Sequence, residues 1–237
     1  MSRVLITRPL EDAEPLAVLL RGMGHAVLVE PLLEIVPLHH PLPDLSEFQA
    51  LLFTSANGVR AFLYASGAVP LPVFAVGGAT ADTALKSGFS NVSSADGDVE
   101  ALARLVIGRC RPEAGALLQI AASERAGDLA GRLEAAGFRV VRDVRYQARP
   151  AAALSPAAAA ALAAGEVGAV LLFSPRTARA LARLLAEAGL TAAGHGVVAL
   201  CLSAAVAAAA ADVPWKQVQV AARPDQAALL DCLSPQV

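Results

Sequence analysis

The sequence is poor in aromatic residues, cysteine and charge. The shortages of cysteine and of clustered basic charge each exclude a class of protein. Aromatic side chains make up 4% and charged side chains 17% of the 237 residues, whereas apolar residues make up 56%. The three cysteines have no CxxC spacing, so a disulfide scaffold and a thiolate metal site are both excluded. The net charge of −2 comes without any lysine or arginine cluster, which excludes a basic face for nucleic acid.

Long apolar runs are missing as well. The most apolar stretch, 157–173, contains Glu166 and two glycines, and it is too short and interrupted to span a bilayer. The N-terminal segment reaches charge and proline before any signal-type apolar run forms. We therefore expect a soluble cytoplasmic protein with reduced thiols and no membrane partner.

The common motifs for nucleotide, metal and hydrolase chemistry are also absent. The sequence contains no GxGxxG, GxxxxGK[ST], HExxH or GxSxG segment. The pair His39-His40 lies in a proline-rich connector and is expected to be a solvated linker pair rather than a metal site. The sequence therefore predicts neither a metal site nor a nucleotide cofactor.

Short apolar runs alternate with helical patterns along the chain. Runs such as VLIT (4–7), LLFT (51–54) and AVLLF (169–173) have the length of buried strands, and helix-period segments follow them. This alternation predicts an α/β fold with parallel sheets. Two connectors, 34–43 and 146–152, carry prolines that exclude helices and favour extended chain.

The chain also repeats itself. At a spacing of 113 residues, Leu16, Leu20, Gly24, Val27 and Pro37 match Leu129, Leu133, Gly137, Val140 and Pro150. Phe53 matches Phe173 at a spacing of 120, and Ala101-Leu102 matches Ala228-Leu229 at 127. Because these matches keep their order, we interpret the sequence as two copies of one α/β unit, near 1–112 and 113–237.

Small hydroxyl residues follow several of the predicted strands. The junctions are FTSANG (53–58), VGGATA (76–81), IAASER (120–125), FSPRTA (173–178), CLSAA (201–205) and ITRP (6–9), the last of which contains Arg8. Ligands of parallel α/β sheets bind beyond the carboxyl ends of the strands, where helix N-termini present free N–H groups. Helix capping accounts for any one junction alone. Six junctions in two related copies favour a lined cleft for a large ligand with several carboxylates.

Taken together, these segments resemble the uroporphyrinogen-III synthase family over essentially the whole chain. The resemblance rests on VLITRP, LLFTSANGVRAF, VGGATADTAL, LLQIAASERAGDLAGRLEAAGF leading into VRYQARP, LLFSPRTARAL and RPDQAALLDCL. It implies two similar parallel-sheet α/β domains joined by a two-stranded β-ladder, with the active-site cleft between them. Domain 1 would combine 1–36 with 149–237, and domain 2 would comprise 38–147.

The resemblance also implies an activity. The enzyme would be a lyase of tetrapyrrole and heme biosynthesis that cyclises hydroxymethylbilane to uroporphyrinogen III, with loss of water and inversion of ring D. Its partner would be this linear tetrapyrrole substrate, the chain would act as a monomer, and no metal or redox cofactor would be required. Tyr146 matches the family's functional tyrosine and is the predicted catalytic residue. The predicted substrate-binding residues are Arg8, Ser55, Ala56, Asn57, Thr80, Ser123, Glu124, Ser174, Arg176 and Ser203.

The segment CLSAA (201–205) departs from the family pattern. Many members carry a glycine, a proline and two threonines there, whereas this sequence keeps a hydroxyl only at Ser203. We therefore expect backbone contacts rather than catalysis at this junction. If backbone amides bind the carboxylates in general, Ser55→Ala should be mild, and Ala56→Pro, expected to force the backbone away, should be much more harmful.

Two other classes of function remain compatible with the sequence. A non-catalytic protein with two α/β lobes could clamp a small anionic ligand, although the lack of a secretion signal counts against it. A phosphosugar or nucleotide enzyme with unrecognised loops is the second alternative. Cyclisation of hydroxymethylbilane to the type III product distinguishes all three.

Overall fold

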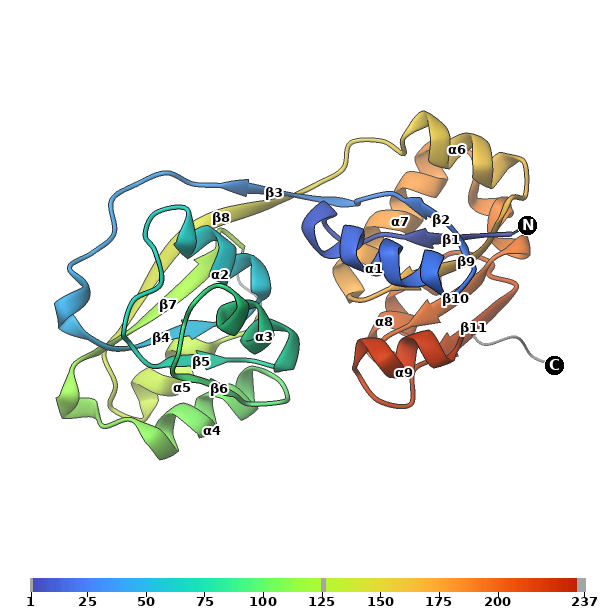
Figure 1. Cartoon of the computed structure of the whole chain (residues 1–237). Coiled ribbons are helices and arrows are strands. Elements are labelled where there is room, and N and C mark those ends of the chain that lie inside the picture. Colours follow the sequence, from blue (N-terminus) through green and yellow to red (C-terminus); the bar gives the residue numbers. More distant parts are fainter. Residues whose placement is uncertain (1, 125–126, 234–237) are drawn as a thin grey trace. The chain divides into compact units, whose positions relative to one another are not determined.

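Two parallel β-sheets, each covered by helices, form the framework of the chain (Figure 1). The structure is a computed structural model, and it describes residues 2–124 and 127–233. The chain divides into two compact units, Met1–Glu34 with Arg149–Val237 (unit 1) and Ile35–Ala148 (unit 2). Unit 1 is therefore built from both ends of the chain and unit 2 from its middle.

Unit 1 holds a five-stranded sheet in the order β11-β10-β9-β1-β2, and these neighbours pair in parallel. Its elements are β1 (Arg3–Ile6), α1 (Leu10–Gly22), β2 (Ala26–Val29), α6 (Pro156–Ala163), β9 (Val167–Leu172), α7 (Pro175–Glu187), β10 (Val198–Cys201), α8 (Ala204–Ala209), β11 (Gln217–Val220) and α9 (Gln226–Asp231), with a 3-10 turn at Thr191–Gly196.

Unit 2 holds strands in the order β8-β7-β4-β5-β6, which also pair in parallel, and β3 (Leu33–Pro37) lies beside β8 at the edge of the same sheet. The other elements are β4 (Phe48–Phe53), α2 (Ala56–Leu63), β5 (Val73–Ala75), α3 (Gly78–Lys86), β6 (Val92–Ser94), α4 (Val99–Arg109), β7 (Ala116–Ala122), α5 (Leu129–Ala135) and β8 (Val140–Pro150), with 3-10 turns at Leu45–Glu47 and Pro112–Ala114.

The two units share one topology. Read from its other edge, the sheet of unit 2 runs β6-β5-β4-β7-β8, which corresponds strand by strand to β11-β10-β9-β1-β2 of unit 1. The sequence matches fall on these equivalent elements: Leu16 and Leu129 lie in α1 and α5, whereas Leu102 and Leu229 lie in α4 and α9. The predicted duplication is therefore confirmed, and each unit combines strands from both copies.

Each sheet is buried between two layers of helices, because its strands are apolar on both faces. In unit 2, α2 contributes Phe62 to the cluster on one face, and α4 and α5 contribute Leu102 and Leu133 to the cluster on the other. In unit 1, α6, α7 and α8 pack on one face, and α1 and α9 pack on the other. The predicted α/β class with parallel sheets is confirmed.

Several elements were not predicted from the sequence. Strands β6 and β11 are short edge strands, and neither is a continuous apolar run. Helix α6 has the sequence PAAAAALA, which has no polar face and therefore gives no helical periodicity. The sequence pattern over 123–137 predicts one helix, but helix α5 begins only at Leu129. Gly127 has a φ of +77°, and Asp128 caps the helix through the Gly131 N–H; residues 125–126 lie outside the described residues.

Cys201 gives a simple test of the core of unit 1. The side chain is fully buried in strand β10, and burial raises the pKa of its thiol to about 11. Because the thiolate is the reactive species, the folded protein should hold Cys201 unreactive at neutral pH. We expect a disulfide reagent, followed by mass spectrometry, to label Cys201 only after unfolding. Labelling in the native protein as fast as that of the partly exposed Cys232 would contradict this burial.

Candidate functional site

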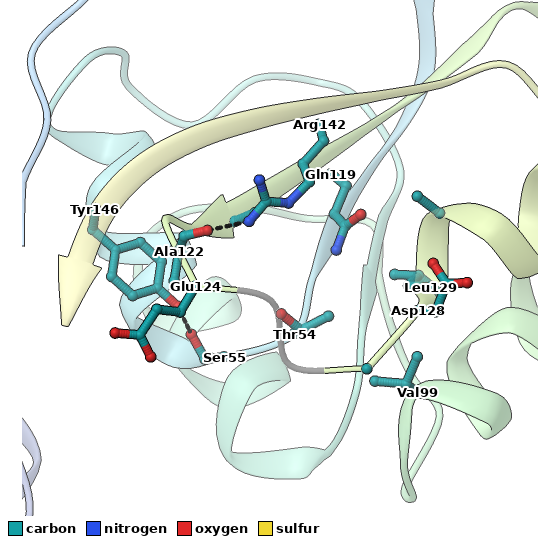
Figure 2. A pocket seen from close by; sticks show the side chains of 13 residues that line it. Thr54, Ser55, Val99, Gln119, Ala122, Glu124, Asp128, Leu129, Arg142 and Tyr146 are labelled. Carbon is teal, nitrogen blue, oxygen red and sulfur yellow. Dashed lines mark hydrogen bonds between the residues drawn. The ribbon is translucent and has the colours of Figure 1, made fainter. Parts of the chain in front are cut away.

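A cavity of about 170 Å³ opens in unit 2 at the carboxyl ends of β4 and β7. The chain passes from β4 to β5 and β6 on one side and returns to β7 on the other, so these two strands flank the topological switch point where α/β proteins bind ligands. The described residues that line the cavity are Thr54, Ser55, Val99, Gln119, Ala121, Ala122, Glu124, Gly127, Asp128, Leu129, Ala130, Arg142 and Tyr146. Figure 2 shows most of these side chains.

Tyr146 and Ser55 are hydrogen-bonded at one side of this cavity (Figure 2). The Tyr146 hydroxyl lies 2.7 Å from Ser55 Oγ, and either oxygen can be the donor. Tyr146 is buried, with 6% of the residue exposed. Its hydroxyl is the group of this side chain that can donate or accept a hydrogen bond. Two of the predicted site residues, 91 positions apart in the sequence, therefore meet in one pair.

An irregularity in strand pairing brings Tyr146 to this position. Ala121 pairs with Val144, but Ala122 pairs with Tyr146, so one residue of β8 is skipped. Without this shift, Arg145 would lie opposite Ala122. Bulges of this kind re-aim side chains near functional sites. Here Arg145 is buried and donates to the His40 and Pro41 carbonyl oxygens, whereas Tyr146 reaches Ser55.

Ser55 has a second role at the start of α2. Its extended backbone, with φ −160° and ψ 157°, makes it the N-cap residue, and its Oγ accepts a hydrogen bond of 3.2 Å from the Gly58 N–H. The same oxygen therefore caps a helix and holds the tyrosine hydroxyl. Ser55→Ala removes both contacts, so we now expect a larger effect than the mild one predicted from the sequence.

The far side of the cavity carries two polar residues that were not predicted. Gln119 and Arg142 are neighbours in register on β7 and β8. Gln119 is 8% exposed, and its Oε1 has no hydrogen-bond partner among residues 2–124 and 127–233. An unsatisfied buried amide costs about 1–3 kcal/mol. A glutamine inside the apolar strand ALLQIAA was the available sequence signal, since such strands otherwise carry apolar residues.

Four other predicted residues of unit 2 are not part of the cavity lining. Ala56 and Asn57 begin α2, and Asn57 accepts a hydrogen bond from Arg60. Thr80 is buried in the first turn of α3, with 6% exposed. The Ser123 N–H donates to the Tyr146 carbonyl oxygen. Glu124, by contrast, does line the cavity with Ser55 and Tyr146.

In unit 1, the predicted residues lie at the equivalent strand ends. Arg8 follows β1, stacks over the Phe173 ring at 4.5 Å, and pairs with Asp12 at 3.4 Å. Ser174 caps α7 through the Thr177 N–H, and Arg176 lies in the first turn of that helix. Ser203 is the N-cap residue of α8 without a capping hydrogen bond from its side chain. These residues form the strand-end region of unit 1.

The expectation that Ala56→Pro displaces the backbone is wrong. Ala56 is the first residue of α2, a position where proline fits, and the extended Ser55 before it has the conformation that proline prefers. The equivalent helix α7 in fact begins with Pro175. The substitution therefore deletes one N–H donor while it leaves the helix in place.

Residues 2–124 and 127–233 hold no group of three or more His, Cys, Asp or Glu side chains placed to bind a metal ion. Within these ranges, every helix is too short or too polar to cross a membrane.

The fold and the cavity define an α/β protein of two doubly wound units with a candidate ligand site at a switch point. The family model described as uroporphyrinogen-III synthase HemD matches residues 14–231. The chain therefore belongs to the uroporphyrinogen-III synthase family, and the resemblance seen in the sequence is confirmed.

Individual relatives agree with this assignment. The chain is 41% identical to a uroporphyrinogen-III synthase of Chlorobaculum parvum (strain DSM 263 / NCIMB 8327) over 64 residues, which cover 27% of this chain and about a quarter (26%) of that protein. The structure of uroporphyrinogen-III synthetase from Helicobacter pylori 26695 matches with a TM-score of 0.63, at 17% identity over 98% of both chains. A mutant uroporphyrinogen III synthase from the extremely thermophilic bacterium Thermus thermophilus matches with a TM-score of 0.55, at 20% identity over 98% of this chain and 97% of that one. At these identities, the two structures show the shared fold.

Proposed function

We propose that this chain is a uroporphyrinogen-III synthase, a lyase that cyclises hydroxymethylbilane to uroporphyrinogen III with loss of water and inversion of ring D. Membership of the family supports this function. The observation that carries it in this chain is the Tyr146–Ser55 hydroxyl pair beside a cavity at the switch point.

The first chemical step breaks the bond between the hydroxymethyl carbon of ring A and its oxygen. The oxygen must gain a proton to leave as water, and the pyrrole nitrogen supplies electrons, which gives an azafulvenium cation. Tyr146 is the proposed donor to the leaving oxygen, and Ser55 orients its hydroxyl. Because Ser55 Oγ is itself fixed by the Gly58 N–H, the pair is held in place before the substrate arrives.

The second step forms a carbon–carbon bond between the cation and the substituted carbon of ring D. The bond from that carbon to the bridge of ring C then breaks and re-forms at the other α-carbon of ring D, which loses a proton, so ring D is inverted. The protein needs to hold the flexible bilane so that the substituted carbon lies within reach of the cation, and proximity supplies much of the acceleration in such closures. We propose that helix N-termini at Ser55, Ala56 and Asn57 in unit 2, and at Ser174 and Arg176 in unit 1, bind the substrate's carboxylates. Arg8, Thr80, Ser123, Glu124 and Ser203 complete the proposed set.

We further propose that the two units are the two domains predicted from the sequence, that β3 and β8 form the ladder joining them, and that the substrate binds in a cleft between them. The pairing of β3 with β8 supports the ladder, because β3 contains the step from Glu34 in unit 1 to Ile35 in unit 2. A cytoplasmic location, a monomeric state and the absence of a nucleic-acid partner belong to the same proposal.

The test is a cyclisation assay on freshly prepared hydroxymethylbilane. The product is oxidised, and the type I and type III isomers are separated by chromatography. Enzyme-dependent type III product is the expected result, whereas type I forms without the enzyme. If the product is type I alone and the protein still binds the bilane, the chain is a binding protein. If the protein neither cyclises nor binds the bilane, the better hypothesis is an enzyme with a phosphosugar or nucleotide substrate.

Ala56→Pro tests whether backbone amides hold the substrate. We expect the variant to keep its unfolding midpoint, because proline fits the first position of α2, and to bind uroporphyrinogen III a few-fold more weakly, because one N–H donor is lost. An exposed anion at a helix N-terminus gains about 0.3–1 kcal/mol from the helix dipole, which sets this scale. Unchanged affinity in the folded variant would show that the Ala56 N–H does not bind the ligand.

A further inference from the structure

The far side of the cavity, opposite the Tyr146–Ser55 pair, holds an unusual pair of side chains. Gln119 occupies a position in β7 whose neighbours on the same face, Leu117 and Ala121, are buried and apolar. Its amide lines the cavity, and its Oε1 is buried without a partner in the described part of the chain. Packing alone would favour an apolar residue here, so the amide indicates a ligand.

Arg142 lies next to Gln119 on the adjacent strand and lines the same cavity. In the described residues its guanidinium makes one hydrogen bond, to the Ala122 carbonyl oxygen, and no salt bridge (Figure 2). A guanidinium has five N–H donors. Most of these donors, and the positive charge itself, are therefore left for a ligand.

Two acidic residues, Asp128 and Glu124, line the same cavity, and neither forms a salt bridge with Arg142 in the described part of the chain. Asp128 uses its Oδ1 to accept a hydrogen bond from the Gly131 N–H at the start of α5. Figure 2 shows the Glu124 carboxylate on the Tyr146 side, directed away from Gln119 and Arg142. The half-buried Arg142 guanidinium can pair with a planar carboxylate through two N–H donors. The Gln119 amide adds a donor when it turns by half a rotation, which places its NH2 group where the unpartnered Oε1 lies.

Size limits what can enter. The cavity volume of about 170 Å³ is several times the roughly 30 Å³ that one water molecule occupies in the liquid. It therefore has room for about five water-sized groups, which is enough for the carboxylate-tipped arm of a pyrrole. Such an arm would enter beside Tyr146 while the ring that bears it stays at the mouth.

We propose that Gln119 and Arg142 form a pocket for one carboxylate arm of the tetrapyrrole, and that this pocket fixes the position of the ring presented to Tyr146. This inference rests on the proposed function for the identity of the ligand. The arm is an acetate or a propionate, which share the recognised chemistry. Arg142 supplies the charge, and the Gln119 amide orients the carboxylate.

The experiment measures the dissociation constants of uroporphyrinogen III and coproporphyrinogen III, both kept reduced, by titration calorimetry. Coproporphyrinogen III carries methyl groups in place of the acetates and keeps the propionates. We expect Arg142→Gln to weaken uroporphyrinogen III binding about 10- to 100-fold, as for loss of a charge-assisted contact. If coproporphyrinogen III binding weakens equally, the arm is a propionate; if it is unaffected, the arm is an acetate.

Gln119 variants test the amide separately. Gln119→Glu places a negative charge against the carboxylate and should weaken binding at least as much as Arg142→Gln. Gln119→Leu should weaken it less while it raises the unfolding midpoint, because it removes the unsatisfied amide. Arg139→Gln, which changes an exposed arginine paired with Glu47, is the matched control and should bind as the wild type does.

The outcomes separate this inference from the proposed function. Normal affinity in both folded Arg142→Gln and Gln119→Glu, in an enzyme that makes the type III product, overturns the carboxylate pocket and leaves the function standing. Tighter binding in Gln119→Glu also overturns it, since that result requires an N–H donor as the ligand group. A wild-type protein that does not cyclise the bilane, but whose variants lose affinity as described, keeps the pocket and refutes the function.

Discussion

Tyr146→Phe is expected to lower kcat for type III formation by about 10- to 1000-fold, the usual range for loss of a general acid. The hydroxyl is the only group removed, and it lies 2.7 Å from Ser55 Oγ. The fold should survive, because the ring stays packed. The affinity for uroporphyrinogen III should change much less than kcat, since the lost contact acts on the leaving oxygen.

Two further variants make this result specific. Tyr64→Phe is the matched control, because Tyr64 is 66% exposed at the end of α2 and should give full activity. Ser55→Ala should lower kcat through Tyr146, so it should add little in the Tyr146→Phe background. A Tyr146→Phe enzyme with wild-type kcat would exclude the tyrosine from the reaction, and additive losses would assign Ser55 a separate role.

Arg145→Met is expected to destabilise the protein by about 3–5 kcal/mol, the usual cost of leaving one partner of a buried ion pair without the other. Arg145 is 1% exposed, and its Nε donates to Asp143 Oδ2 at 2.6 Å. The guanidinium also donates to the carbonyl oxygens of His40 and Pro41 in the connector that leads to β4. The substitution therefore leaves the buried Asp143 carboxylate facing only the partly exposed imidazole of His40 among the described residues, 3.5 Å away, and removes two of the hydrogen bonds that hold this connector to β8.

Urea unfolding followed by circular dichroism measures the change, with the exposed Arg139→Met as the control. The double variant Arg145→Met/Asp143→Leu should recover part of the loss, because an apolar pair replaces the uncompensated carboxylate. If Arg145→Met unfolds at the same urea concentration as the wild type, the buried pair contributes nothing to stability. If the double variant is less stable than the single one, Asp143 has a role beyond its pairing with Arg145.

The sequence predicted the α/β class because both sheets are built from short apolar strands whose burial on two faces is visible in the residues themselves. It did not predict α6 or β11, since an alanine-rich helix without polar residues and a mostly exposed edge strand lack the contrast between two faces that a periodic pattern needs. Helix α6 owes its place to packing in unit 1, and β11 owes its place to pairing with β10.

Part of the site was equally visible. Tyr146 and Ser55 were predicted, but their contact was not, because it depends on one residue skipped in the pairing of β7 with β8. Gln119 and Arg142 were missed, although a glutamine inside an apolar strand was a usable signal. Their proximity requires the register between two strands, which the sequence alone does not give.

The split composition of unit 1 has a consequence for the order in which the protein is made. Strand β1 pairs with β2 and with β9, and the buried face of α1 packs on residues such as Leu171 and Leu200. A ribosome adds about 5–20 residues per second, so these first elements wait on the order of ten seconds for their partners. Unit 2, which is contiguous, emerges complete in that interval. During synthesis the N-terminal segment is therefore the part with an exposed apolar surface, and we expect nascent chains released before β9 to bind chaperones through residues 1–34.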